Sequence, residues 1–77
     1  MTSTRTPEQL HQLMQDQTLL LLVHTIDLEA SGSKDKLDWV TFLLEDIKNL
    51  VKNEGAVATK DQARRLRDAR RAVRNAK

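Results

Sequence analysis

The chain has 77 residues, of which 39% are hydrophobic, 31% are charged and 3% are aromatic, and it contains no cysteine. A chain of this length supports one small domain and leaves little room for an enzyme pocket. Without cysteine it can form no disulfide, thiolate metal site or cysteine nucleophile, so we expect a reducing, cytoplasmic setting. The longest apolar run, residues 19–23, is far shorter than the roughly 20 residues of a membrane-spanning helix, so we expect a soluble chain without a membrane partner.

Charge is distributed unequally along the sequence. Residues 1–54 contain five basic and nine acidic residues, a net charge of −4, whereas residues 55–77 contain eight basic and two acidic residues, a net charge of +6. The excess of positive charge therefore belongs to the C-terminal segment, and a surface that binds an anionic partner is expected there.

The first helix is expected over about residues 7–30. Thr6 is a suitable N-cap, Pro7 suits the first helical position, and Gln9 completes a capping box. The helix should end just before Gly32, because glycine accepts the positive φ of a helix terminus.

A second helix is expected over about residues 34–54, with Ser33 as its candidate cap and Gly55 just beyond its end. A third is expected over about residues 60–75, because Thr59 opens another capping-box pattern. No segment shows the alternation or the β-branched enrichment of a strand. The sequence therefore predicts an all-α fold of three helices in one small domain.

The first two helices are apolar over a larger part of their circumference than one neighbouring helix covers. One stripe of the second helix has the spacing of a bundle seam: Leu37, Val40, Leu44, Ile47 and Val51. The third helix offers only a thin apolar stripe: Leu66, Ala69, Val73 and Ala76.

The residues expected to face a second copy or an apolar partner are Leu19, Leu22, Val23, Ile26, Trp39, Phe42, Leu43 and Leu50. The sequence therefore predicts that the first two helices form a hairpin that pairs with a second hairpin, most simply in a homodimer. The alternative is a monomer whose exposed patch binds another protein.

His24 and Asp27 are adjacent on the surface of the first helix and are the one pair that could carry acid–base or metal chemistry. A metal site needs three or four convergent ligands, which the sequence does not supply, so we favour packing of His24 at the bundle seam. Phosphate-cradling and dinucleotide-binding motifs are absent from the sequence. We therefore expect no catalytic residue, metal, cofactor or small-molecule substrate.

The most distinctive pattern is a row of basic residues on the third helix, spaced four, three, four and three apart, which we call the arginine ridge: Lys60, Arg64, Arg67, Arg71 and Arg74. Arg70 stands beside it and belongs to the same predicted partner-binding set. Three interpretations remain open: a solvated surface, a nucleic-acid contact, or a contact with an acidic protein surface. The helix could also be disordered until it binds, because its apolar area is small.

These patterns together favour a small, non-enzymatic regulator or inhibitor. It would bind and modulate a macromolecular partner, with another protein preferred over nucleic acid. The alternative is a nucleic-acid-binding regulator whose dimer presents two basic helices to DNA or RNA.

Overall fold

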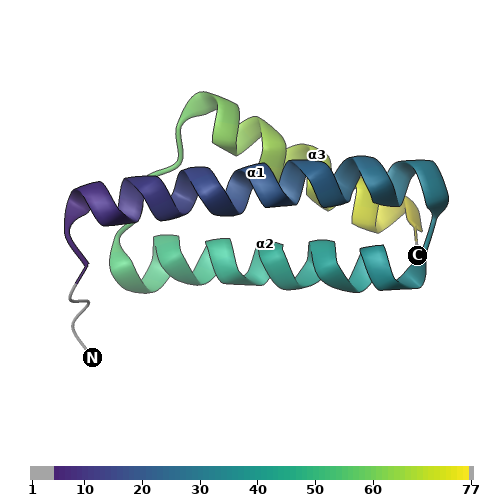
Figure 1. Cartoon of the computed structure of the whole chain (residues 1–77), viewed down its shortest axis with the longest axis horizontal. Helices are drawn as coiled ribbons and strands as arrows, with labels where there is room; N and C mark the ends of the chain where they lie inside the picture. The colour runs from purple at the N-terminus through teal and green to yellow at the C-terminus, as the bar shows by residue number, and fades with distance from the viewer. Residues whose placement is uncertain (1–4, 77) are drawn as a thin grey trace.

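The computed structural model describes residues 5–76, which form three α-helices packed against one another. Helix α1 spans Pro7–Ser31, α2 spans Lys34–Glu54 and α3 spans Lys60–Ala76. Helices α1 and α2 form an antiparallel hairpin, and α3 lies against both and runs in the same general direction as α1 (Figure 1). The all-α, three-helix fold predicted from the sequence is confirmed for these residues.

Two of the three helices begin with a capping box. At the start of α1, the backbone N–H of Gln9 donates to Oγ1 of Thr6 at 3.1 Å, and the N–H of Thr6 donates to Oε1 of Gln9 at 2.9 Å. The same reciprocal pair joins Thr59 and Gln62 before α3, at 3.1 and 3.0 Å. Ser33 precedes α2 in an extended conformation, but its side chain makes no capping hydrogen bond. The boundary of α2 therefore does not depend on a side-chain cap.

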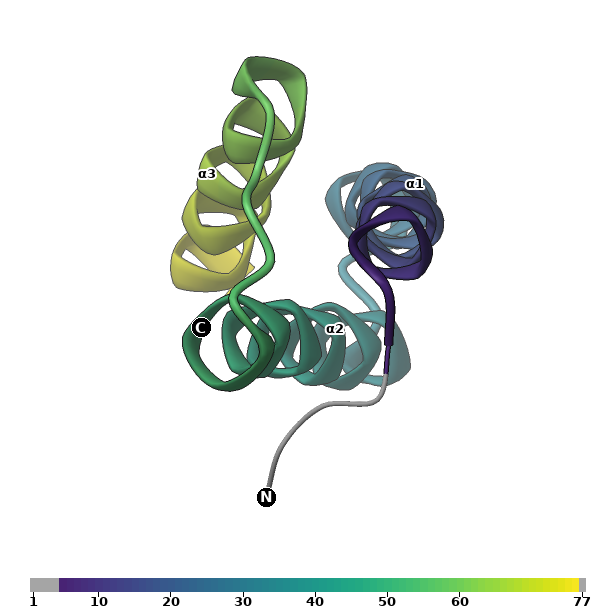
Figure 2. The same cartoon turned by 90° about the vertical axis from the view of Figure 1, so that its left-hand side faces the viewer.

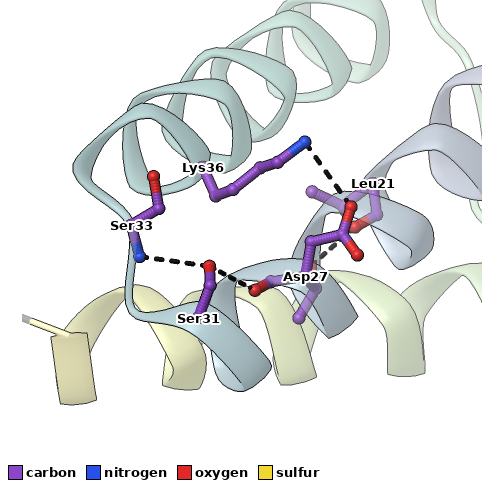
Figure 3. A network of polar contacts seen from close by, with 6 residues as sticks. Leu21, Asp27, Ser31, Ser33 and Lys36 are labelled. Atoms are coloured by element: carbon purple, nitrogen blue, oxygen red, sulfur yellow. Dashed lines mark hydrogen bonds and ion pairs between the residues drawn. The ribbon is translucent and has the colours of Figure 1, made fainter.

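The turn between α1 and α2 depends on one glycine and two serines. Gly32 has a φ of 64°, and its N–H donates to a carbonyl of the last turn of α1 at 2.8 Å. The hydroxyl of Ser31 donates to the carbonyl of Asp27 at 2.8 Å and accepts from the N–H of Ser33 at 3.3 Å (Figure 3). Lys36 of α2 forms a 3.5 Å ion pair with the Asp27 carboxylate (Figure 3). Because a solvent-exposed ion pair contributes little, the left-handed Gly32 is the main determinant of this turn.

All three helices contribute to the core. The hairpin supplies most of its large side chains: Met14, Leu21, Leu28, Val40, Leu43, Ile47 and Leu50. Helix α3 supplies Leu66, Ala69 and Ala72, and the segment before it supplies Ala56. Alanine projects only a methyl group, so α3 can pack closely on the hairpin. Leu66 is the one large apolar side chain that α3 buries.

Within residues 5–76, three polar side chains are also buried. Thr18 and Thr25 lie on the core face of α1, where their hydroxyls donate to the carbonyls four residues earlier at 2.7 and 2.6 Å. Gln62 is 1% exposed, and its side-chain amide donates to Oε1 of Gln15 at 3.1 Å, which joins α3 to α1. Each of these side chains is satisfied by a hydrogen bond, which removes most of the cost of burying it.

The packing corrects two of the predicted stripes. The buried stripe of α2 shares only Val40 and Ile47 with the predicted seam, and its other members are Leu43 and Leu50. Val51, predicted for the seam, is exposed, because α2 is contacted from two sides, by α1 and by α3, and its buried face points between them. On α3, Ala76 is exposed because it is the last residue of the helix, and Ala72 is buried instead.

Candidate interaction surfaces

Helix α1 has a second apolar face, directed away from the core of the chain. Leu19, Leu20, Val23 and Ile26 are each about half exposed. Leu19, Val23 and Ile26 follow one another at spacings of four and three, so they form one stripe along the helix, with Leu20 beside it. This spacing is the one that helices use to pack along a seam.

The exposed apolar area continues onto α2 through stacked rings. His24, one turn after Leu20, stacks on Trp39 with ring centroids 5.5 Å apart and planes 9° apart. Phe42 meets Trp39 edge to face at 6.3 Å. Trp39 and Phe42 are both more than half exposed. We call the six exposed residues the outer apolar surface: Leu19, Leu20, Val23, Ile26, Trp39 and Phe42.

This surface overlaps in part with the one predicted from the sequence. Leu43 and Leu50 are buried in the core of the single chain, because they lie on the face of α2 that packs inward, and their assignment to a binding face is thereby corrected. Leu22 is half-buried. Leu20 was missed by the sequence argument, although its position three residues before Val23 places it on the same side of α1.

The border of the outer apolar surface on α2 is acidic. Asp35 and Asp38 line a shallow hollow together with Trp39 and Phe42. The nearby carboxylate of Asp27 is paired with a lysine of α2. Two carboxylates beside the rings disfavour the approach of a phosphate group, so the aromatic pair is poorly suited to stacking on nucleobases.

His24 lies at the seam between α1 and α2. Its Nδ1 atom is buried without a hydrogen-bond partner, and the carboxylate of Asp27 pairs with Lys36 of α2. Across residues 5–76, no three histidine, aspartate or glutamate side chains converge as metal ligands. The arrangement therefore gives His24 a packing role against Trp39.

The arginine ridge lies on the solvent side of α3. All five of its residues are exposed, whereas the opposite face of the helix is buried against the hairpin. At 1.5 Å per residue, the row from Lys60 to Arg74 is about 21 Å long. Arg71 also pairs with Asp68 one turn earlier, at 2.8 Å and in an exposed setting that adds little stability.

The two remaining arginines of α3 are placed differently. Arg70 is exposed at the edge of α3 and lines a hollow with Val51 and Val57 on the side that faces α2. Arg65 is half-buried, and its Nη1 atom is enclosed without a hydrogen-bond partner. The row available to an approaching ligand is therefore the predicted ridge, with Arg70 beside it.

Comparisons of the chain with protein-family models, with curated proteins and with solved structures found no match. In the part of the chain that the structure describes, no helix is both long enough and apolar enough to cross a membrane.

Proposed function

We propose that this chain is a non-enzymatic, cytoplasmic interaction protein that acts by binding and modulating another protein. It also binds a second copy of itself, and it does so through the outer apolar surface. The observation that carries this proposal is the set of six large apolar side chains that stay about half exposed on α1 and α2 after α3 has packed.

The size of this surface fits a dimer interface. Six large side chains that are half exposed offer roughly 500 Å² of apolar area, near the upper limit found on stable monomers. A standard interface takes about 800 Å² from each partner, and in homodimers about 65% of that area is apolar, again roughly 500 Å². One copy therefore has about the apolar area that a second copy would cover.

The pattern of the surface also suits a second copy. A two-fold interface must be complementary to itself, since the same patch comes from both partners. The stripe of Leu19, Val23 and Ile26 has the four-three spacing that lets two helices interdigitate. Pairing of two α1 helices, with the aromatic pair at the border, would form the four-helix arrangement expected for two hairpins.

The test is a charge placed at the centre of the stripe. Val23→Lys keeps helix propensity high, but it would bury one unpaired ammonium group per copy, which should raise the dissociation constant of the dimer more than about 100-fold. Val57→Lys is the matched control, because Val57 is highly exposed in the segment between α2 and α3, outside the outer apolar surface. Sedimentation equilibrium should give a dimer for the parent and for Val57→Lys, and a monomer of unchanged helix content for Val23→Lys. A monomeric parent, or equal behaviour of the two variants, would contradict the proposal.

A second candidate function, nucleic-acid binding, is supported by the arginine ridge. The ridge is a charged surface on α3, whereas the outer apolar surface lies on α1 and α2, so binding through one does not exclude binding through the other.

A further inference from the structure

The arginine ridge is a regular array of charge. Its five cations follow one another at three- or four-residue steps, which places a positive charge about every 5 Å along the helix. A nucleic-acid strand is the polyanion that repeats a negative charge at a regular short interval, whereas acidic groups on a folded protein surface are spaced irregularly. The regularity therefore favours nucleic acid over an acidic protein.

The ridge is accessible from outside the bundle. Helix α3 forms one flank of the molecule, and the side that faces away from α1 and α2 has no neighbouring helix over it (Figure 2). An α-helix with its side chains is about 10–12 Å wide, and the major groove of B-form DNA is about 12 Å wide. The major groove of duplex RNA is deep and narrow, so a helix cannot enter it to bring its cations between the two backbones, and the width of the helix favours DNA.

The inner face of α3 is fixed before any ligand arrives. Leu66 and Ala69 are buried against the hairpin, and Gln62 bonds both to Thr59 at the start of the helix and to Gln15 of α1. The ridge is thus held on a docked helix, and its arginines need no folding step to reach their positions.

Helix α3 carries two carboxylates, Asp61 and Asp68, against six arginines and Lys60, and Asp68 pairs with Arg71. The groups that would favour single strands lie on another helix. Trp39 and Phe42, which could stack on unpaired bases, are on α2 beside Asp35 and Asp38. A surface with cations and no stacking platform suits a duplex, whose bases are already stacked.

We propose that the arginine ridge of α3 binds the phosphate backbone of duplex DNA. This inference rests on the second candidate function named above, for which it specifies the ligand, and it does not require self-association because each copy carries a complete ridge. Two ridges in a dimer would add avidity without changing the contacts that one ridge makes.

The experiment is a fluorescence-anisotropy titration of a labelled DNA duplex, about two helical turns long, at several salt concentrations. If the five cations of one ridge all neutralise phosphates, log K should fall with log[salt] with a slope of about −4.5 for each ridge bound, an affinity loss of about 500-fold per ridge between 50 and 200 mM salt. The double variant Arg64→Gln with Arg67→Gln should reduce the slope to about −2.7 and the loss to about 40-fold. Lys34→Gln with Lys52→Gln removes the same charge from exposed positions of α2 and should leave the slope unchanged.

Three further probes decide between ligand classes: single-stranded DNA, duplex RNA and polyglutamate of similar charge. Weaker binding of all three than of duplex DNA is the expected result. The proposal is overturned if the parent does not bind the duplex at 50 mM salt, if the α2 variant loses as much as the ridge variant, or if any of the three binds as tightly as duplex DNA. Val23→Lys is titrated beside the parent, and the mass of both proteins is measured by sedimentation equilibrium. Loss of self-association is then read from the mass, whereas loss of DNA binding is read from the titration of the ridge variant.

Discussion

Truncation of single leucines in the run 19–22 tests which side of α1 faces the core. Leu21 is 0% exposed and packs among all three helices, whereas Leu20, its neighbour in sequence, is 48% exposed. Truncating a buried leucine removes its transfer free energy and leaves a cavity, which costs about 2.7–5 kcal/mol. Leu20→Ala removes the same atoms from a half-exposed site and should cost about 1 kcal/mol or less.

The difference is large relative to the total stability. At about 0.05–0.15 kcal/mol per residue, a chain of 77 residues has an unfolding free energy of about 4–12 kcal/mol. Leu21→Ala should therefore remove at least about a fifth of it and lower Tm by at least about 11 °C. Urea and thermal unfolding followed by far-UV circular dichroism, at the lowest workable protein concentration, measure both variants. Equal losses for Leu20→Ala and Leu21→Ala, or a loss below 1 kcal/mol for Leu21→Ala, would refute this assignment of the core face.

Three further stability predictions follow from the caps, the turn and the buried amide, all measured by the same unfolding assay. Thr6→Ala should lower the unfolding free energy by about 1 kcal/mol because it breaks a capping box, whereas Ser33→Ala should change it by no more than about 0.5 kcal/mol because that side chain makes no capping bond. A larger loss for Ser33→Ala than for Thr6→Ala would contradict the assigned caps. Gly32→Ala should cost about 1–2 kcal/mol from the left-handed backbone alone, since a Cβ there would meet no atom within 4 Å, and a neutral result would show that the turn can adopt another conformation. Gln62→Ala should cost about 1.5–3 kcal/mol, because it removes both a capping hydrogen bond and the hydrogen bond to Gln15 of α1. A loss no larger than that of a cap alone would show that the hydrogen bond to Gln15 contributes no stability.

The helix boundaries could be predicted because they are set by local chemistry. The capping boxes at Thr6 and Thr59 act within four residues, and so do the left-handed glycines at Gly32 and Gly55. Ser33 shows the limit of such reasoning: a suitable residue type stands at the boundary, but the turn brings its N–H to Ser31 and leaves its hydroxyl without a capping bond.

The composition of the core could be predicted only in part, because some polar side chains are satisfied in ways that a sequence pattern does not reveal. Thr18 and Thr25 are buried because each hydroxyl returns to a carbonyl of its own helix. The capping-box pattern that begins at Thr59 implies a capping role for Gln62, but the position of Gln62 in the core depends on Gln15, 47 residues away. A prediction of the core from apolar residues alone therefore leaves these three buried residues out.

The two candidate surfaces differ in how far the sequence specifies them. The arginine ridge was predictable because α3 has a single apolar stripe, and its charged face must lie on the other side. The outer apolar surface was predicted only approximately, because α1 and α2 each carry more than one apolar stripe. Which stripe becomes core depends on where α3 packs, and this choice buried Leu43 and Leu50 while it left Leu20 exposed.

The most direct test of self-association through the outer apolar surface uses Trp39, the single tryptophan of the chain, which lies within that surface. Sedimentation equilibrium and Trp39 emission are measured on the same samples over a dilution series that spans micromolar concentrations. We predict that the mass rises from 8.8 kDa to twice that value with concentration, and that Trp39 emission moves to shorter wavelength in step with it as the ring is removed from water. A mass that stays at 8.8 kDa, or a doubling of mass that leaves the emission of Trp39 unchanged, would contradict the account.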